Sequence, residues 1–264
     1  MLKREAFKNW NTLLSKALDA EAIDERFSHA MKAVKDLVPS DSCYFIFFRK
    51  DQTPVMAFPQ EQVAPGQAYS EGAYLLDPFY LGFRDKGLAG TFLLKDIAPR
   101  HLPSSKRYRE YLSSLTGPVD ELAMSVAISD QTTAHLSLSR LIENGRYSRR
   151  DFESLEAAAP LLGSLMAQIW DQLHPTLGPG GTQMDRHLAF YQSFGANILT
   201  EREYDVAHLL LKGYSAGEIG PILSISPGTA RNHMKQIYGK FEVSSQAELA
   251  GLFIEQLMAE IGNS

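Results

Sequence analysis

The feature that most constrains this chain is a series of four closely spaced helix-start signatures near its C-terminus. Three are Ser/Thr-x-x-Glu capping boxes, in which the hydroxyl and the carboxylate each satisfy a backbone N–H of the first helical turn. They are Thr200–Glu203, Ser215–Glu218 and Ser245–Glu248. The fourth has Ser226 as its cap and Pro227 at the first helical position, where a missing N–H costs nothing. The signatures predict an all-α domain of four short helices, the second of them shortened or kinked at Gly220-Pro221.

A segment rich in proline and glycine separates this region from the rest of the chain. His174–Gly181 contains two prolines and three glycines in eight residues, and helical patterns flank it on both sides. Such a composition is typical of a linker. A chain of 264 residues also exceeds one typical domain and fits two. We therefore expect a first domain over 1–174, a linker over 175–184 and a helical domain over 185–264.

The pattern before the linker is mixed, and it does not alternate between strands and helices as a doubly wound fold would. The expected elements are, in chain order, helices over 2–18 and 22–38, a strand SCYFIFFR from Ser42 that pairs with 54–58, a turn-rich or helical segment around Pro78, a hairpin over 121–141 that turns at 130–132, and a long helix capped by Ser148. This order predicts an antiparallel sheet flanked by helices, an α+β architecture.

Composition and charge exclude several classes of protein. The hydrophobic content of 44% supports a core of ordinary size, and no apolar run approaches the roughly 18 residues of a membrane span. The N-terminus lacks a secretory signal and the single cysteine, Cys43, can form no intrachain disulfide, so we expect a cytoplasmic protein. No Cys or His pair has metal-ligand spacing, and no spacing singles out a nucleophile and its base. We therefore expect no metal, no cofactor and no catalytic activity.

The segment SISPGTARNHMKQIYGK, residues 224–240, is basic and contains no acidic residue, in a chain whose formal net charge is −5. At 100° per residue, an apolar stripe forms on one side from Ala230, Met234, Ile237 and Phe241. The opposite side carries Gly228, Asn232, Lys235 and Gly239, with Arg231 and Gln236 beside them and Thr229, His233 and Lys240 at one border. A small, polar, positive helix face suits the major groove of DNA, where Arg and Lys favour guanine and Asn favours adenine. The alternative interpretation is a solvated helix whose charges happen to be positive.

The helical domain as a whole is nevertheless acidic. From Asn197 to the C-terminus there are five Lys and Arg and eight Asp and Glu, a formal charge of −3. Such a domain should repel DNA except along its basic helix, so a single copy should bind weakly. Two linked copies gain effective concentration for the second half-site. We therefore expect a homodimer that binds double-stranded DNA at a roughly palindromic site.

Residues 199–249 resemble the C-terminal DNA-binding domain of LuxR-type transcription regulators. The shared residues include Leu199-Thr200, Arg202-Glu203, Leu210, Gly213, Ser215, Glu218-Ile219, Ile225-Ser226, Thr229, His233, Ile237, Lys240 and Val243. The departures are Ala230 where the family usually has Val, Glu242 for a common Gly, and Gly220-Pro221 where helix formers are usual.

This resemblance implies a role for the basic helix and for the helix after it. The basic helix would lie in the major groove, with Arg231, Asn232 and Lys235 facing the bases. The implied phosphate contacts are Thr229, His233, Lys240, Ser226 and Gln246. The last helix, about 246–258, would pair two such domains on DNA.

The first domain resembles, in the order of its elements, the GAF or PAS-like sensor domains that often precede this DNA-binding domain. The stretch AYLLDPFYLGFRDKGLAGTFLLKDIAP is also similar to the middle of the sensor domains of LuxR-type regulators, and Tyr74 and Asp77-Pro78 match residues of acyl-homoserine-lactone receptors. In those receptors the Asp accepts the ligand amide N–H and a nearby Trp holds the lactone carbonyl. Here both tryptophans, Trp10 and Trp170, lie elsewhere, so the lactone assignment stays open.

Aromatic residues are dense in the first domain, where they either pack as core or line an apolar cavity. Strand alternation places Tyr44, Ile46 and Phe48 on one face of the sheet. It places Phe45 and Phe47 on the other face. The candidate ligand contacts are Tyr44, Ile46, Tyr74, Asp77, Phe79 and Tyr80.

Several polar residues of the first domain have more than one interpretation. Asp77 is either a ligand contact or a helix cap before Pro78. Asp120 and Glu121 begin a strand, where they either reach a pocket rim or lie in solvent. The histidines His101 and His135 have no partner that the sequence reveals.

Together these features predict a transcription regulator whose first domain senses a small-molecule effector of unknown identity and controls a dimeric helix-turn-helix. The alternative is a regulator without a small-molecule ligand. In that case a protein partner controls the first domain, or the N-terminal helix and the long helix over 148–173 hold a constitutive dimer.

Overall fold

The computed structural model describes residues 4–57, 69–70, 72–98, 119–177 and 181–262. Its centre is a five-stranded sheet with strand order β2-β1-β5-β4-β3, in which every neighbouring pair is antiparallel. The strands are β1 (Ser42–Arg49), β2 (Gln52–Ala57), β3 (Gly90–Leu93), β4 (Val119–Ala127) and β5 (Thr132–Leu141). The expected α+β architecture, the pairing of β1 with β2 and the β4–β5 hairpin are confirmed.

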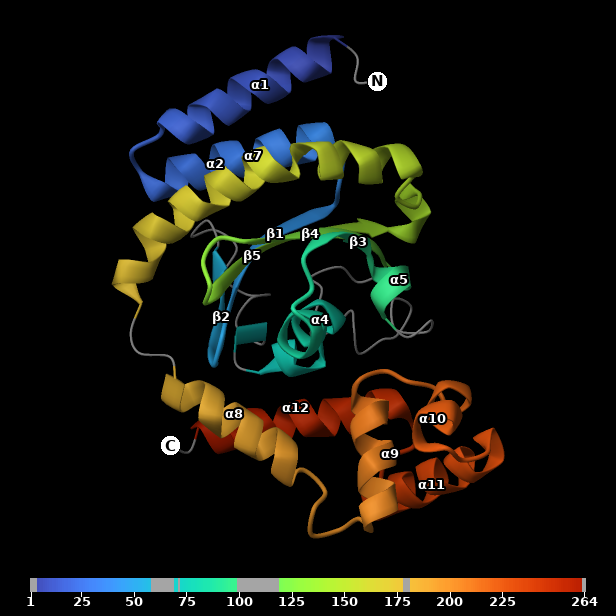
Figure 1. The fold of residues 1–264 in the computed structure, drawn as a ribbon. Helices are drawn as coiled ribbons and strands as arrows, with labels where there is room; N and C mark the ends of the chain where they lie inside the picture. Colours follow the sequence, from blue (N-terminus) through green and yellow to red (C-terminus); the bar gives the residue numbers. More distant parts are fainter. Residues whose placement is uncertain (1–3, 58–68, 71, 99–118, 178–180, 263–264) are drawn as a thin grey trace.

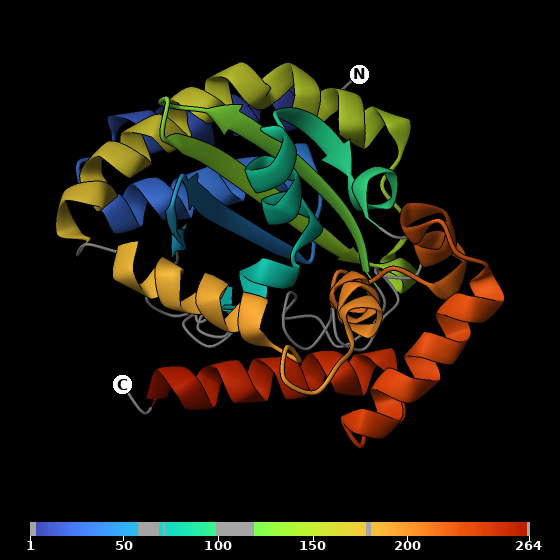
Figure 2. The same cartoon turned by 60° about the horizontal axis from the view of Figure 1, so that its bottom comes forward.

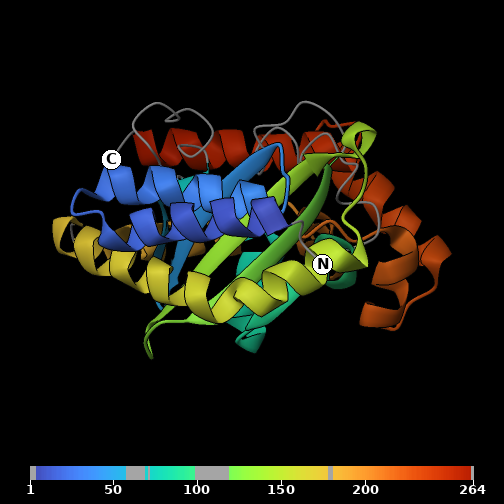
Figure 3. The ribbon, with the colours of Figure 1, turned by 90° about the horizontal axis from the view of Figure 1, so that it is seen from above.

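Three long helices cover one face of the sheet, which we call the outer face. They are α1 (Arg4–Asp19), α2 (Ile23–Leu37) and α7 (Arg149–Leu173), and they lie together above the strands (Figures 1 and 3). Ser148 begins α7 through a capping box with Asp151, as the sequence predicts. Phe45 and Phe47 point into this layer, where they join a hydrophobic cluster with side chains of all three helices.

The opposite, inner face of the sheet carries Tyr44, Ile46 and Phe48. The 3-10 helix η2 (Ala73–Leu76) and the helices α4 (Pro78–Lys86) and α5 (Leu94–Ile97) lie on this side. Both sheet faces are therefore buried, and strand alternation assigns the aromatic residues of β1 to the two faces as expected.

The C-terminal part of the chain contains only helices. After the 3-10 helices η4 (Ile142–Asn144) and η5 (His174–Thr176), the chain forms α8 (Gly181–Ser193), α9 (Glu201–Leu211), α10 (Ala216–Leu223), α11 (Pro227–Lys240) and α12 (Gln246–Gly262). The caps at Thr200, Ser215 and Ser226 begin α9, α10 and α11 where the signatures predict them. Helix α8 begins at Gly181, inside the segment predicted as a linker, so residues 181–184 are helical.

The helix α10 continues through Pro221 and has eight residues. The expected shortening is therefore present, and the helix ends at Ser224, which adopts the left-handed conformation with φ 56°. Gly220 is required at this turn, because a Cβ there would lie 2.9 Å from the carbonyl oxygen of Ile225. The unusual Gly220-Pro221 pair is thus accommodated by a tight approach between α10 and the turn that leads to α11.

The helices α8 and α12 pack together beneath the inner face through Phe190 and Tyr191 of α8 and Phe253 of α12, and α8 also contacts strand β2 (Figures 1 and 2). One continuous hydrophobic cluster runs from β1 through η2 and α4 into α8, α9 and α12. The helical part therefore shares a core with the first domain. This shared core places the inner face in contact with the segment that follows the linker.

Two adjacent leucines of α7 test the outer layer. Leu162 is fully buried against the sheet, whereas 40% of the surface of Leu161 is exposed. We expect Leu162→Ala to lower the free energy of unfolding by about 2–5 kcal/mol, because it leaves a cavity in a packed core. The control Leu161→Ala should change it by less than about 0.5 kcal/mol. Urea unfolding followed by circular dichroism measures both, and equal costs would contradict the placement of α7.

Candidate functional site

Helix α11 presents its polar side to solvent because the apolar residues on its other side are buried. Ala230 and Ile237 are fully buried against the neighbouring helices, while Arg231, Asn232 and Lys235 are exposed. Ser226 caps the helix by accepting a hydrogen bond of 3.0 Å from the backbone N–H of Thr229. The three side chains that the sequence predicts as base contacts therefore lie on one accessible face of a well-capped helix.

The predicted phosphate contacts of this helix have different surroundings. Thr229 is exposed and its hydroxyl lies 2.8 Å from that of Ser226. His233 is half-buried, and its Nδ1 has no hydrogen-bond partner in the described part of the chain. A phosphate role for these side chains stays a prediction, and their positions at one border of the exposed face are compatible with it.

Lys240 and Gln246 are held by partners within the chain. The Lys240 ammonium donates to the buried carboxylate of Glu203 at 2.7 Å and to the carbonyl of Ile198 at 3.1 Å. The hydrogen bond to Lys240 and the cap at Thr200 lower the pKa of Glu203 to about 2. Gln246 donates to the carbonyl of Leu210 at 2.7 Å. Both residues therefore hold helices together, whether or not they also contact DNA.

The inner face of the sheet contains a group of buried polar side chains. We call Tyr69, Asp77, Glu121 and Ser137 the inner-face cluster. Asp77 caps α4 by accepting from the backbone N–H of Phe79 at 2.9 Å, and it also accepts from the hydroxyl of Tyr69 at 2.7 Å. Burial raises the pKa of Asp77 to about 6, against the opposing effect of these hydrogen bonds. The cap interpretation of Asp77 is confirmed, and a ligand contact stays a proposal.

Glu121 is buried, so the alternative that it lies in solvent is wrong. Only 5% of its surface is exposed, because the odd-numbered residues of β4 face the inner side, which η2 and α4 cover. Its Oε1 accepts a short hydrogen bond from the hydroxyl of Ser137 on β5, and its Oε2 has no partner among the described residues. Burial, and then the nearby carboxyl of Asp77, raise the pKa of Glu121 to about 8.

Asp120 is also buried, on the opposite side of the same strand, where a structural role explains it. It accepts from the backbone N–H of Tyr147 at 2.8 Å and lies 3.8 Å from the guanidinium of Arg146. Of the two carboxyls that begin β4, Asp120 therefore anchors the chain before α7, whereas Glu121 faces the interior.

His135 lies on the inner face of β5 and is fully buried. Its Nδ1 is 2.9 Å from the hydroxyl of Ser125, and its Nε2 has no partner in the described residues. The rings of Phe48 and Phe79 pack on it at 4.8 and 5.0 Å. Burial lowers the pKa of His135 to about 3, so the ring is neutral at pH 7. The other lone histidine, His101, lies outside the described residues.

Tyr74 and Tyr80 join the inner face to α8. The hydroxyl of Tyr74 lies 3.0 Å from both Met184 Sδ and His187 Nδ1, and that of Tyr80 lies 3.8 Å from the same sulfur. Burial lowers the pKa of His187 to about 4, so this contact involves a neutral imidazole at pH 7. Two of the predicted ligand contacts are therefore bonded to a helix of the C-terminal part.

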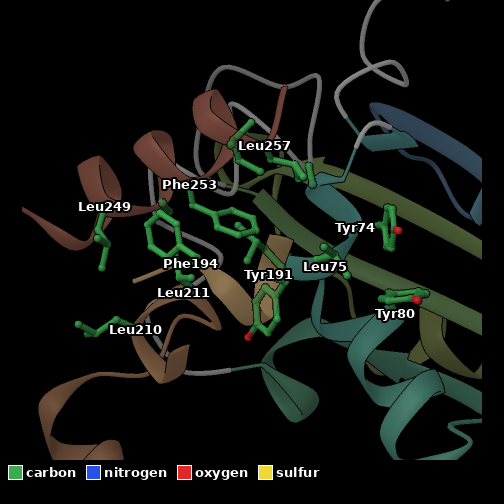
Figure 4. Packing of buried hydrophobic residues seen from close by; sticks show 14 of the residues in the cluster. Tyr74, Leu75, Tyr80, Tyr191, Phe194, Leu210, Leu211, Leu249, Phe253 and Leu257 are labelled. Atoms are coloured by element: carbon green, nitrogen blue, oxygen red, sulfur yellow. The ribbon is translucent and has the colours of Figure 1, made fainter. Parts of the chain in front are cut away.

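Helix α12 packs against the same region with its apolar side (Figure 4). Its apolar side is buried, with Phe253 packed on Phe194 at 5.2 Å and on Tyr191 at 5.8 Å between ring centroids. Leu257 lies against Gly72, which has φ +135° and no room for a Cβ. The helix that the resemblance assigns to pairing on DNA therefore has its apolar side covered within its own chain.

The structure brings the predicted ligand residues together and adds others. Tyr44, Ile46, Tyr74, Phe79 and Tyr80 are all buried in the cluster on the inner side, and Asp77 lies among them. The sequence did not predict that Glu121, Ser137, His135, Met184 and His187 lie on the inner side of the sheet. The alternation in HLSLS, residues 135–139, was the available signal, because a central strand has no solvent side on which to place polar residues.

The described residues lack two other kinds of site. No group of three or more His, Cys, Asp or Glu side chains among them is placed to hold a metal ion. Nor does any helix in the described ranges have both the length and the apolar character needed to cross a membrane.

The titration of Glu121 predicts a pH dependence of stability. Its pKa is about 8 in the folded chain and 4.5 as a model value, so the folded state holds its proton over a range where the unfolded state releases it. Stability is therefore lost as pH rises through this range. The buried histidines titrate around pH 6.5 in the unfolded state and contribute equally in a variant that changes Glu121 alone. We expect the free energy of unfolding of the wild type, relative to that of Glu121→Gln, to fall between pH 6.5 and 8, measured by urea unfolding. Equal slopes in both proteins would contradict the burial of this carboxyl.

Comparisons with known proteins agree with this geometry. Residues 197–253 match the family described as bacterial regulatory proteins, luxR family. An HTH-type transcriptional regulator in the exeN 3′ region of Aeromonas salmonicida is 34% identical over 194 residues, which are 71% of this chain and 98% of that protein. The nitrate/nitrite response regulator protein NarP of Escherichia coli is 34% identical over 83 residues, 30% of this chain and 39% of that protein.

The first domain also has a structural counterpart. The crystal structure of the VqsR LBD domain from Pseudomonas aeruginosa is similar, with a TM-score of 0.50 and 26% identity over 61% of this chain and 96% of that one. This similarity favours the autoinducer-binding-like sensor type over GAF or PAS domains. The family consists of transcription regulators and not of enzymes. The chain therefore belongs to the LuxR family, as a DNA-binding transcription regulator with an autoinducer-binding-like N-terminal domain and a C-terminal helix-turn-helix.

Proposed function

We propose that this regulator senses a small molecule at the inner face of its sheet and that the bound molecule controls whether two copies bind DNA together. The proposed parts are a sensor over 1–174, a linker over 175–184 and a DNA-binding domain over 185–264. The observation that carries the proposal is the contact of Tyr74 with His187, because it joins a candidate ligand residue to the helix that follows the linker.

The proposed DNA interface is the exposed face of α11. Arg231, Asn232 and Lys235 reach outward from a helix whose opposite side is anchored by Ala230 and Ile237. Long polar side chains at such positions can read base edges in the major groove. The N-terminus of the helix, with Ser226 and Thr229, offers donors to a phosphate. The further phosphate contacts in this proposal are His233, Lys240 and Gln246.

Charge supports a homodimer on a roughly palindromic site. The residues from Asn197 onward carry a formal charge of −3, so the attraction to DNA is confined to the α11 face. Joining two such faces raises the effective concentration of the second after the first has bound. Two-fold symmetry of the protein then requires two-fold symmetry of the site.

The proposed switch concerns the position of α12. Its apolar side, with Phe253 and Leu257, is covered by α8 and by η2 in this arrangement. If the same side pairs two DNA-binding domains, the docked arrangement and the paired arrangement exclude each other. An effector can shift this balance only if it binds one arrangement more tightly than the other.

A second candidate is control by a protein partner or by a constitutive dimer. The observation in its favour is Phe7 on α1, of which 51% is exposed although its ring lies 6.1 Å from that of Trp10. Leu161 on α7 is also exposed. An outer helical layer with such residues offers a surface for a second protein chain.

The DNA interface can be tested by single substitutions on α11. Arg231→Ala and Lys235→Ala should each weaken binding to an operator duplex, selected by the protein from a random library, by about 1–3 kcal/mol if they contact bases. The control Lys86→Ala, which removes an exposed positive charge from α4 rather than α11, should change binding by less than about 0.5 kcal/mol. Fluorescence anisotropy measures all three. Equal weakening on unrelated duplexes would assign Arg231 and Lys235 to phosphates instead.

The docked arrangement can be tested by removing one hydroxyl. Tyr74→Phe keeps the ring but loses the contact with His187, which is worth about 1 kcal/mol as a net hydrogen bond. Without effector, we expect the variant to bind operator DNA up to about five-fold more tightly, because undocking becomes easier. Tyr80→Phe is the control, since its hydroxyl reaches only a sulfur at 3.8 Å. Unchanged DNA affinity in Tyr74→Phe, or an equal gain in both variants, would contradict the proposed coupling.

A further inference from the structure

We propose that the effector is an organic cation, an amine with an apolar body whose protonated nitrogen binds Glu121. This inference rests on the proposed sensing function and names the chemical class of the effector. It follows from three features of the inner-face cluster: an oxygen of Glu121 without a partner among the described residues, two neighbouring buried carboxyls that no described cation contacts, and an aromatic lining.

The unused acceptor is Oε2 of Glu121. The other oxygen accepts from Ser137, whereas Oε2 has no hydrogen-bond partner among the described residues although the residue is only 5% exposed. Buried polar atoms in folded proteins are nearly always hydrogen-bonded, and a carboxylate oxygen is costly to leave unpaired. A donor that arrives with a ligand removes this cost. The position of the atom, on the inward side of β4, directs it toward η2 and α4 rather than toward solvent.

The second feature is that Asp77 and Glu121, two buried carboxyls, lie close together. Asp77 is close enough to Glu121 to raise the pKa of Glu121 by repulsion. The oxygens of Asp77 are already occupied by the N–H of Phe79 and the hydroxyl of Tyr69. No Lys, Arg or His side chain of the described ranges forms an ion pair or hydrogen bond with either carboxyl. In the unliganded protein the raised pKa keeps Glu121 mostly protonated at pH 7, and a cationic ligand would let this carboxyl ionise by supplying the positive partner that a buried charge requires.

The lining of the same face is aromatic. The rings of Tyr69 and Tyr74 lie 6.1 Å apart, and Tyr74 and Tyr80 meet edge to face at 4.7 Å. Aromatic faces attract cations and apolar bodies alike. The same surface therefore suits an amine with a hydrocarbon or aromatic body, and it suits a small inorganic cation poorly because too few oxygens converge there.

A neutral acyl lactone satisfies this site less well. Its amide N–H would meet Asp77, whose oxygens already have donors, and it would bring no charge to offset the pair of carboxyls. Electrostatics therefore favour the amine over the lactone at this position.

The test uses matched amine and alcohol pairs with the full-length protein. The probes are phenethylamine with 2-phenylethanol, hexylamine with 1-hexanol, and hexanoyl-homoserine lactone as the neutral reference. Isothermal titration measures affinity and thermal unfolding checks it. We expect at least one amine to bind the wild type ten-fold or more tightly than its alcohol, and we expect Glu121→Gln to abolish this preference.

Two variants separate binding from folding and from overall charge. Glu121→Gln keeps the size of the side chain and can still accept from Ser137, so its unfolding curve shows whether the fold survives. Asp120→Asn removes the neighbouring carboxyl, which serves Tyr147 on the other side of β4, and it should keep the preference for the amine. A preference that is lost equally in both variants would indicate a general effect of charge and would overturn the assignment.

The outcomes also distinguish this inference from the sensing function. Equal binding of amine and alcohol, or a preference that survives in Glu121→Gln, overturns the cation assignment. Binding of the lactone alone, with the same affinity in wild type and Glu121→Gln, overturns it while sensing stands. If no probe binds, the cation assignment fails, and the sensing function loses its support in favour of control by a protein partner.

Discussion

The rest of the structure depends on one constraint, which is that the central sheet is apolar on both faces. Phe45 and Phe47 require the layer of α1, α2 and α7, and Tyr44, Ile46 and Phe48 require a cover on the other side. The short elements η2, α4 and α5 supply part of that cover, and α8 and α12 extend it. The C-terminal helices are therefore held to the sensor by the hydrophobic effect, and any state that releases them must bury comparable apolar surface elsewhere. Pairing of α12 between two copies on DNA is one way to do so.

The two faces of the sheet differ in chemistry although they are equally buried. Along the middle of β4 and β5 the outward residues are apolar, as Leu122, Leu136 and Leu138 show, and the outward Asp120 at the start of β4 is hydrogen-bonded within the chain. The inward residues include Glu121, His135 and Ser137, which cost desolvation energy and leave polar atoms without partners. Proteins place such groups in a core when a ligand or a conformational change uses them. The outer face therefore serves packing, whereas the inner face carries the buried polar groups that the proposed ligand site uses.

Much of the fold follows from local rules of the sequence, and the parts that do not follow depend on tertiary contacts. Capping boxes at Thr200 and Ser215 place α9 and α10 because their hydrogen bonds are local. Strand alternation assigns the two faces of β1, since a period of two is also local. The burial of Glu121 was missed because it depends on η2 and α4, which cover the inner face of the sheet but lie far from β4 in the sequence. The internal partners of Lys240 and the contact of Tyr74 with His187 join residues far apart in the chain, which no local pattern reveals.

The position of Glu121 limits how an effector can act. Glu121 lies on β4, inside the sensor, so a ligand that contacts this carboxyl alone binds the docked and undocked arrangements equally and shifts nothing. Regulation requires that the same ligand also change the contact between Tyr74 and α8. The path for this is short, because Asp77 lies beside Glu121 in the cluster and stands three residues from Tyr74, between η2 and α4. Coupling is reciprocal, so a ligand that loosens α8 raises DNA affinity by the same factor by which DNA raises ligand affinity. In the proposed mechanism, the head of the effector would supply affinity at Glu121, and the shape of its body at Tyr74 would set the direction of the response.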